Sequence, residues 1–458
     1  MRPALPRAAM LACAVALAGC ASFSADGGFG RVAQLTKERT GHAPAWQRGA
    51  APDPAVRARI DELLAQPLSA DGAVEFALLA QPGLQARFAE LGVAEAELVR
   101  AGRLRNPVLG LGRLAGGGAL EIDRSLMFDL LGLLTMPAAR QAGQQQFEQA
   151  QLQAAYDAVG VAAEARRSWI LAVAAAQRLA YDRQVKETAD LAAELARRMV
   201  KAGNFSRLDQ LREQAYYADA DAQLARSQLQ AQAARERLVR ALGWAGDPQR
   251  IRLPEHLPDL PAAPAPAHDA EQTAMTHRLD LLIARRNAEA LATSLGLTKS
   301  TRFVDVLRAG VQNKSSRDAP TLAGGQVELE LPLFDGGGPR VVQAEARYRQ
   351  ALQQTAQVAL NARSEVRESY AAYRAAWEQA RHWRDELLPL RKAIVDESLL
   401  RYNGMLGSVF ELLADAREQS LAVGSTMDAL RDYWLADAEL QAAISGRPGT
   451  ARPDPNPS

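Results

Sequence analysis

Residues that could support catalysis are sparse in this sequence. The glycines Gly336-Gly337-Gly338 precede an expected helix, but no Lys-Ser or Lys-Thr pair follows them, and Pro339 removes an N–H group that a phosphate would need. The five histidines show neither HExxH spacing nor another paired-ligand pattern, and no GxSxG elbow occurs. The sequence therefore predicts no enzyme, no metal site and no cofactor.

The most specific local signal surrounds a cysteine near the N-terminus. A basic stretch and an apolar run too short to span a bilayer end in Leu17-Ala18-Gly19-Cys20. This pattern resembles a bacterial lipoprotein signal over residues 1–19, with cleavage before Cys20 and acylation of its thiol. An ordinary secretory signal that contains a cysteine is the alternative. By the same resemblance, Ala21 after the cysteine implies the outer membrane.

Composition narrows the possible partners. The chain is 48% hydrophobic and 23% charged, so it can bury a large core. Basic and acidic residues number 54 and 53, and the net charge is +1. Nucleic-acid binding needs a basic face that neutralises phosphates, so we predict no nucleic-acid partner.

The two halves of the chain share one plan. Gly203 with its flanking residues matches Gly404 at a shift of 201, and each half reads as helix, strand, strand, long helix, glycine turn and helix. A proline-rich linker over 245–268 separates the halves. The predicted helices are 72–103, 138–201, 206–243, 270–300, 340–402 and 407–445.

Helix lengths indicate an assembly. The helix 138–201 would be about 96 Å long and its returning partner 206–243 about 57 Å. The helix before the first strands accounts for the missing length, so we expect each long helix to lie beside two shorter ones stacked end to end. A single-chain rod would leave its apolar stripe uncovered, and we therefore expect oligomers.

Apolar and polar residues alternate along the predicted strands. Val327, Leu329, Leu331 and Leu333 alternate with acidic residues within a strand predicted at 326–334, which follows another at 303–312. About ten residues per strand is the length that crosses a membrane at a tilt, with apolar side chains toward lipid and polar ones toward a lumen. A half-buried soluble sheet is the alternative. Four strands cannot close a barrel, whereas three copies would supply twelve. The predicted lumen-facing residues are Glu121, Asp129, Glu328 and Glu330.

The chain resembles the outer-membrane factors of bacterial efflux and secretion, the TolC-like proteins. The residues that show this resemblance are Leu331-Pro332-Leu333-Phe334-Asp335-Gly336-Gly337, Gln81-Pro82-Gly83-Leu84 and Arg278-Leu279-Asp280, within a similarity covering roughly residues 60–445. The resemblance implies a mainly α fold with transmembrane β: a homotrimer with a twelve-stranded β-barrel in the outer membrane on a long α-helical periplasmic barrel. Its implied partners are a periplasmic adaptor protein and an inner-membrane efflux pump. Leu131 to Pro137 departs from the family signature, so the register of the first strand-helix junction stays open.

The resemblance divides the chain into consecutive segments. The expected segments are a signal peptide at 1–19, a lipidated N-terminal segment at 20–71, a first repeat at 72–243, a proline-rich equatorial linker at 244–269, a second repeat at 270–446 and a disordered tail at 447–458.

Two groups of residues are implied as functional. The glycine turns lie at the far ends of helical hairpins, where exposed loops serve binding, although glycine there also caps helices. Acidic residues just beyond the turns would constrict a tunnel and favour cations, although such residues also stabilise a helix start. The expected adaptor contacts are Gly203, Asn204, Phe205, Gly404, Met405 and Leu406. The expected gate residues are Glu411, Asp415 and Asp209.

The sequence thus predicts a lipid-anchored outer-membrane channel subunit that conducts substrates passively and extends into the periplasm. The alternative is a periplasmic coiled-coil scaffold lipoprotein that forms no pore. Nothing in the sequence chooses among drugs, metals and polypeptides as the substrate.

Overall fold

The computed structural model describes residues 22–49, 53–116, 119–204, 206–266, 269–316 and 320–446. These residues form two compact units, each assembled from separate segments of the chain. The first unit lies within Met1–Val32, Arg87–Ala155 and Leu279–Leu360, and the second within Ala33–Ala86, Tyr156–Arg278 and Asn361–Ser458. The predicted signal peptide with Cys20, as well as Phe205 and the predicted tail at 447–458, lie outside the described residues.

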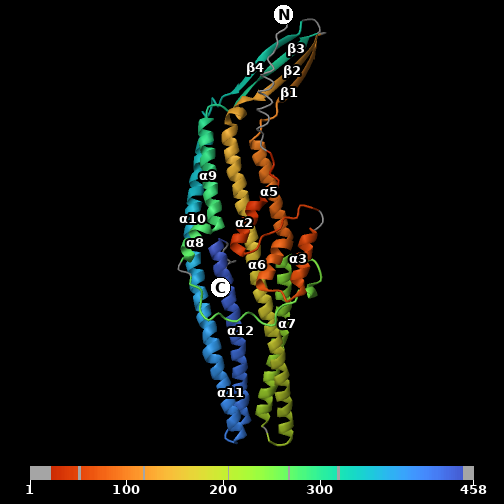
Figure 1. Cartoon of the computed structure of the whole chain (residues 1–458), viewed down its shortest axis with the longest axis vertical. Helices are drawn as coiled ribbons and strands as arrows, with labels where there is room; N and C mark the ends of the chain where they lie inside the picture. The colour runs from red at the N-terminus through yellow and green to blue at the C-terminus, as the bar shows by residue number, and fades with distance from the viewer. Residues whose placement is uncertain are drawn as a thin grey trace. The chain divides into compact units, whose positions relative to one another are not determined.

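A four-stranded antiparallel sheet dominates the first unit (Figure 1). Its order, β1-β2-β3-β4, follows the sequence, so the sheet combines one hairpin from each half of the chain. The pairing of β2 with β3 joins the halves, with Phe128 opposite Ala309. The strands are β1 (Val108–Gly116), β2 (Ala119–Asp129), β3 (Val306–Ser316) and β4 (Leu322–Glu330).

The two strands of the second hairpin begin and end at other residues than predicted. β3 begins at Val306 rather than at residue 303, and β4 ends at Glu330, so Leu331 and Leu333 lie beyond the strand. Pro332 has no N–H for the ladder, and the chain turns there instead. The Leu333 N–H donates to the Leu331 carbonyl at 2.8 Å, and the Gly336 N–H donates to the Pro332 carbonyl at 2.8 Å.

The first long helix begins earlier than predicted. α6 (Leu130–Lys201) follows β2 without a loop and runs through Pro137, rather than starting at residue 138. The Asp129 carboxylate accepts a 2.8 Å hydrogen bond from the Gly132 N–H, the arrangement of a helix N-cap. This cap settles the junction that the sequence left open, because it starts the helix one residue after the strand.

Two predicted helices are each divided by one extended residue. The helix expected at 72–103 is α4 (Ala70–Ala80) followed by α5 (Pro82–Ala101), and the one expected at 270–300 is α8 (Ala270–His277) followed by α9 (Leu279–Ser300). Gln81, with φ −66° and ψ 114°, precedes Pro82, which disfavours the helical conformation before it. Arg278 adopts a similar conformation, with φ −61° and ψ 126°.

The second unit is built on two long helical hairpins (Figure 1). α6 and α7 (Arg207–Leu242) form the first, and the helices predicted at 206–243 and 407–445 are confirmed by α7 and α12 (Val409–Ser445). The helix expected at 340–402 is interrupted: α10 (Gly338–His382) leads through a π-helical turn (Trp383–Leu387) into α11 (Leu388–Asn403). The remaining elements are α2 (Phe29–Thr40), α3 (Pro54–Ala65) and a 3-10 turn (Pro248–Arg250).

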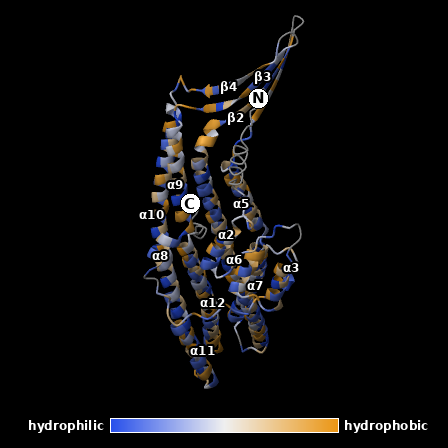
Figure 2. Ribbon diagram, turned by 45° about the horizontal axis from the view of Figure 1, so that its top comes forward, coloured by the Kyte–Doolittle hydropathy of each residue, from blue (hydrophilic) through white to orange (hydrophobic). Residues whose placement is uncertain are grey.

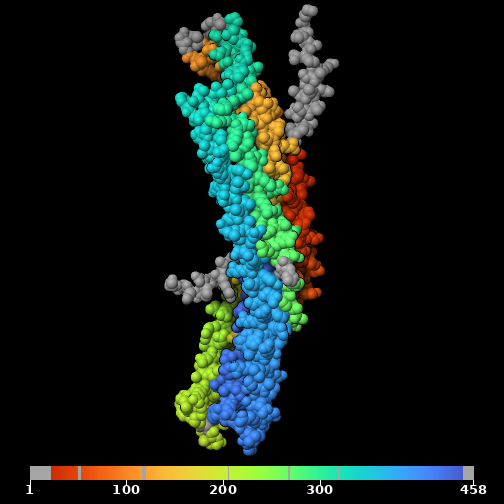
Figure 3. All heavy atoms as spheres, turned by 90° about the vertical axis from the view of Figure 1, so that its left-hand side faces the viewer, coloured from red at the N-terminus to blue at the C-terminus, as the bar shows by residue number. Residues whose placement is uncertain are grey.

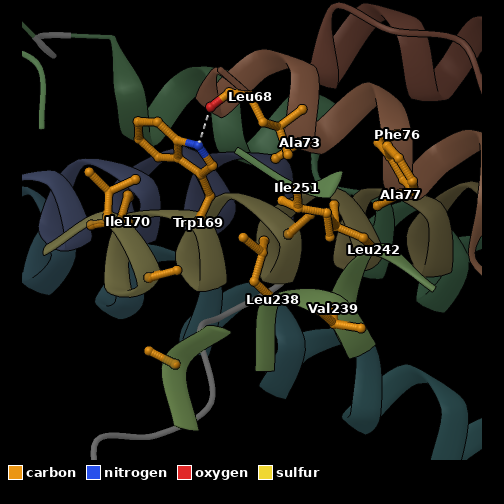
Figure 4. Close-up of a cluster of buried hydrophobic side chains, with 14 of the residues drawn as sticks. Leu68, Ala73, Phe76, Ala77, Trp169, Ile170, Leu238, Val239, Leu242 and Ile251 are labelled. Carbon is orange, nitrogen blue, oxygen red and sulfur yellow. Dashed lines mark hydrogen bonds between the residues drawn. The ribbon is translucent and has the colours of Figure 1, made fainter. Parts of the chain in front are cut away.

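The main core of the second unit packs α3 and α4 on α6 and α7 (Figure 4). Trp169 of α6 is 3% exposed, and its indole N–H donates to the Leu68 carbonyl at 2.7 Å. Leu238 and Leu242 of α7 are fully buried beside it. Buried alanines of α6, such as Ala165 and Ala172, add little bulk and so let neighbouring helices approach closely.

The proline-rich linker is irregular, as predicted, and residues 251–266, here called the strap, are tied to the helices. The Trp434 indole N–H donates to the Pro258 carbonyl at 2.9 Å, and the Trp377 indole N–H donates to the Pro261 carbonyl at 3.0 Å. Trp377 and Tyr433 belong to one buried cluster, in which burial and the neighbouring Tyr373 hydroxyl raise the pKa of the Tyr433 phenol.

Across the residues that the structure describes, no helix is both long and apolar enough to cross a membrane.

Candidate functional site

The strand register places the four predicted lumen residues on one face of the sheet. Asp129 lies opposite Arg308, which in turn lies opposite Glu328. Because side chains alternate along a strand, Glu121 shares the face of Asp129, and Glu330 shares the face of Glu328. The spacing seen in the sequence therefore corresponds to a real surface, here called the acidic face.

The acidic face also holds two cations that the sequence analysis did not single out. Arg308 lies 3.2 Å from the Glu328 carboxylate, and Lys314 lies 3.8 Å from Glu121. Both cations come from β3, between the acidic strands β2 and β4. Such cross-strand pairs contribute roughly 0.2–1 kcal/mol each. Asp123, on the same face, accepts hydrogen bonds of 2.9 and 2.8 Å from the Gln312 amide. Alternation along β3 would have found both cations had the strand pairing been known.

Asp129 has a structural task besides its place on the acidic face. Its carboxylate caps α6 and lies 3.2 Å from Arg105, and its side chain is 16% exposed. Among the four predicted lumen residues, Asp129 is therefore the one that also stabilises the junction between β2 and α6.

The opposite face of the sheet, here called the apolar face, is exposed on the single chain. Leu111 of β1 is 73% exposed and Val327 of β4 is 70% exposed. Arg113 and Arg124 interrupt this face, as the pairing places them beside Ile122 and Leu111. Figure 2 shows hydrophobic and hydrophilic residues interspersed along the strands. An exposed apolar surface of this kind marks a contact with lipid or another protein. Its other large exposed members are Leu109, Phe128, Val311 and Leu329.

The two hairpin tips end their first helices with the same hydrogen-bond pattern. The Asn204 N–H donates to Met199 at 3.0 Å, as the Leu406 N–H donates to Arg401 at 2.8 Å. The left-handed residue of the first tip is Gly203, with φ 77°. In the second tip it is Met405, with φ 58°, whereas Gly404 has φ −81°. The prediction that Gly404 makes the turn as Gly203 does is thus wrong by one residue.

The tips therefore align at a shift of 202, not 201. Ser206 caps α7 and Ser408 caps α12, and each hydroxyl accepts from the backbone N–H three residues later, Asp209 and Glu411 respectively. Asp209 and Glu411 are equivalent residues, which the sequence alignment had offset by one. Figure 3 shows the tip of the second hairpin, in blue, beside that of the first, in yellow-green.

Alanine substitutions at the two glycines should distinguish these alignments. Gly203→Ala is expected to cost about 1 kcal/mol of local stability, because a side chain disfavours the left-handed conformation. Gly404→Ala is expected to change stability by less than about 0.5 kcal/mol, because its backbone suits alanine. Hydrogen exchange of the tip amides measures both. Equal losses at the two positions would contradict the alignment at 202.

The three predicted gate carboxylates all have hydrogen-bond partners within their own hairpin. Glu411 is exposed and completes a capping box, accepting from the Ser408 N–H at 3.3 Å. Asp209 accepts from the Ser206 hydroxyl and from Arg212 at 3.0 Å. Asp415 accepts from the Ser398 hydroxyl and so links α12 to α11. Glu411 and Asp209 both lie in the first turn of their helices, where a carboxylate also stabilises the helix start.

A buried ion pair between the two hairpins is the clearest feature that the sequence did not reveal. Arg417 of α12 donates to Glu213 of α7, whose side chain is only 4% exposed. The Arg417 guanidinium also lies 4.5 Å from the centre of the Tyr216 ring. Tyr181 of α6 donates to the Ser420 carbonyl of α12 at 3.0 Å. These residues line a cavity of about 310 Å³ between α6, α7 and α12. No local pattern pairs Glu213 with Arg417, since 204 positions separate them.

The described segment nearest to Cys20 is fixed to the first unit. The Ser24 N–H donates to the buried Glu95 carboxylate of α5 at 2.6 Å, and Gln151 of α6 donates to the Gly28 carbonyl at 2.9 Å.

In the described part of the chain, no three His, Cys, Asp or Glu residues are placed so that they could hold a metal ion together.

The fold is similar to that of several solved membrane channels. The Campylobacter jejuni CmeC outer membrane channel aligns with a TM-score of 0.70 and 13% identity, over 92% of this chain and 93% of that chain. The outer-membrane channel OprN gives 0.69 and 19%, over 90% and 95%. The outer membrane protein VceC from Vibrio cholerae gives 0.64 and 18%, over 82% and 96%. No protein-family model and no curated protein matches the chain. At these identities the likeness establishes the fold alone.

Proposed function

We infer that this chain, which has the TolC-like fold of outer-membrane efflux channels, is the outer-membrane channel subunit of a tripartite efflux system. The observation that supports this function most directly is the sheet with one exposed apolar face and one acidic face. An isolated four-stranded sheet in lipid would leave the backbone groups of β1 and β4 unpaired, which is prohibitive. Three copies joined edge to edge would close a twelve-stranded barrel.

In that homotrimer the apolar face would contact outer-membrane lipid, and the acidic face would line a water-filled lumen. Glu121, Asp129, Glu328 and Glu330 would make the lumen electronegative despite the cations of β3. The 72–243 and 270–446 repeats would continue as an α-helical tunnel in the periplasm. A duct without an energy source conducts passively, so the chain would act with a periplasmic adaptor protein and an inner-membrane pump.

The hairpin tips would be the adaptor-docking surface. Met405 and Leu406 are neighbours in the second tip and are 94% and 74% exposed, so together they present an apolar surface. Their exposure supports the proposed contact, which also includes Gly203, Asn204, Phe205 and Gly404. A left-handed non-glycine residue stores backbone strain of the kind found at functional sites, and Met405 is such a residue.

The equivalent carboxylates Asp209 and Glu411, with Asp415, would narrow the bore near the tips. We expect Glu411→Gln to raise single-channel conductance and to lower cation selectivity, because it removes one charge per chain from a narrow passage and keeps an oxygen for the Ser408 N–H. Planar-bilayer recording of purified protein checks both quantities.

The control is Ser408→Ala, which removes the partner of the cap but leaves the Glu411 charge in place. It is expected to loosen the helix start by about 1 kcal/mol with selectivity unchanged. An unaltered channel in Glu411→Gln, in oligomers of unchanged mass, would remove Glu411 from the gate.

The proposal includes lipid anchoring at Cys20. We expect Cys20→Ser protein to lack the acyl chain and still to require detergent, because the apolar face of the sheet remains. Intact-protein mass spectrometry and sedimentation with and without detergent measure these properties. Delipidated protein that stays dispersed without detergent would favour the alternative, a periplasmic coiled-coil scaffold without a pore.

Conductance of the purified protein, with its oligomeric mass measured on the same sample, tests the function itself. Small cation-selective currents from a trimer are expected. A well-folded sample that gives no current and has another stoichiometry would contradict the proposal.

A further inference from the structure

Two arginines interrupt the apolar face of the sheet. Arg113 of β1 lies opposite Ile122, and Arg124 of β2 lies opposite Leu111. Both arginines are exposed. A cation on the lipid side of a membrane strand is costly at every depth except near the membrane surface. Insertion of the sheet into lipid therefore does not by itself explain why the two arginines are there.

The two arginines are neighbours on the sheet and have no protein partner. Arg124 lies two residues along β2 from the residue opposite Arg113, and such diagonal neighbours are about 7–8 Å apart. Among the residues that the structure describes, neither side chain has a hydrogen bond or an ion pair. The Asn313 amide oxygen, directly across from Arg124 on β3, also has no partner, so the sheet does not use this guanidinium. Like charges this close repel each other unless an anion lies between them.

No carboxylate of the sheet can neutralise this pair. The cations of the opposite face, Arg308 and Lys314, are each paired with a carboxylate of a neighbouring strand. A second copy joined edge to edge would bring the same four strands, and hence no carboxylate on the apolar face. The anion therefore has to come from outside the protein. The acidic residues of the four described strands all lie on the acidic face: Glu121, Asp123, Asp129, Glu328 and Glu330.

The arginines mark the level at which polar side chains enter the apolar face. Between this level and the helices, the face carries apolar side chains as far as Phe128. From Arg124 toward the hairpin turns, β3 adds Asn313 and Ser315 to the same face. Because β2 continues directly into α6, the hairpin turns lie at the end of the sheet away from the helices (Figure 1). The apolar band thus ends at the arginines, on the side of the sheet far from the helices.

The height of the apolar band agrees with a membrane border at this level. Exposed apolar side chains continue beyond the strands to Leu134 of α6, which is 70% exposed. From Leu134 to Arg124 the chain covers about 20–25 Å, allowing for strand tilt. The apolar band of membrane barrels is about 25 Å high. With the helices in the periplasm, the arginines would lie among the headgroups of the outer leaflet.

We propose that Arg113 and Arg124 together bind a phosphate group in the headgroup of an outer-leaflet lipid. A guanidinium donates two parallel hydrogen bonds to a phosphate and is more weakly hydrated than an ammonium, so it suits the edge of an apolar band. The Asn313 amide offers further donors beside Arg124. The inference rests on the proposed insertion of the sheet into the outer membrane, and it adds the class of lipid that the sheet selects there.

Lipid binding by the full-length protein in detergent tests the site. The probes are lipid A, which carries phosphate groups, and the same lipid after removal of its phosphates. Native mass spectrometry at increasing lipid concentration measures the affinity for each and the oligomeric mass of the same sample. Wild-type protein is expected to bind lipid A at least about tenfold more tightly, the effect of one or more charge-assisted hydrogen bonds.

Three variants assign this preference to the arginines. Arg113→Gln combined with Arg124→Gln is expected to abolish it. Arg113→Lys combined with Arg124→Lys is expected to keep part of it, because an ammonium keeps the charge but not the two-pronged donor. The matched control is Lys314→Gln, which removes a cation at the same end of the sheet but on the acidic face, and the preference should stay unchanged.

The possible outcomes separate this inference from the proposed function. Equal affinity of wild-type protein for the two lipids would overturn the inference, and so would a preference that survives both glutamine substitutions. Inorganic phosphate alone is expected to bind weakly, since it lacks acyl chains; binding as tight as that of lipid A would assign the site to the free ion. A wild-type trimer that conducts without distinguishing the lipids refutes this inference alone. If the glutamine variant does not assemble, the wild-type and lysine measurements still decide.

Discussion

Replacing Arg278 with alanine is expected to lower the free energy of unfolding by about 3–5 kcal/mol. Arg278 is 1% exposed and is the single extended residue between α8 and α9. Its guanidinium donates to the Ala443 carbonyl of α12 at 3.0 Å and to the Glu365 carboxylate of α10 at 2.7 Å. Alanine would leave both acceptors short of a donor and open a cavity the size of the lost side chain.

The measurement is the unfolding transition of purified protein in detergent, followed by the loss of helical circular dichroism. Arg285→Ala is the control, since Arg285 is an exposed arginine on the adjoining helix, and its effect should stay within about 0.5 kcal/mol. Arg278→Lys keeps the charge but not the two-pronged donor, so an intermediate loss is expected. A loss below about 1 kcal/mol in Arg278→Ala would show that this contact does not hold the break in place.

The second large effect is expected at the ion pair between the hairpins. Arg417→Ala removes the cation from Glu213, whose side chain is only 4% exposed in the folded chain. An uncompensated buried carboxylate costs about 3–5 kcal/mol. The expected result is a large loss of stability localised to α7 and α12, seen as faster hydrogen exchange in those two helices.

A double substitution separates the charge from the packing. Glu213→Leu with Arg417→Met replaces the pair by apolar side chains of similar length, and we expect it to recover most of the stability lost in Arg417→Ala. The control Arg226→Ala lies on the exposed side of α7 and should have little effect. A double variant as unstable as Arg417→Ala would contradict an electrostatic origin.

Sequence reasoning was most successful where one segment determines its own structure. Alternation put Glu328 and Glu330 on the face that the strand register now gives them, because successive side chains of a strand point to opposite faces whatever the strand pairs with. The starts of α7 and α12 were found within two residues for the same reason, since the glycines of the hairpin tips interrupt a helix locally. The duplicated plan also followed from the sequence, and the fold agrees with the family resemblance.

The errors arose where distant residues decide a local conformation. The break at Arg278 depends on acceptors that are far away in the sequence, and the π-helical turn before Pro389 coexists with a strap contact over 100 positions away. The turn at Met405 rather than at Gly404 shows the same limit, because a glycine permits a left-handed conformation without requiring it.

By itself the sequence determined the helix and strand types, the duplicated plan and the alternating faces of the strands, since these depend on local propensity and periodicity. Only the tertiary structure decided the order of the sheet, the breaks within the helices, the one-residue offset of the tips and the pairing of Glu213 with Arg417. Each of these depends on which segments meet in space, because buried polar groups of one segment find hydrogen-bond partners on another.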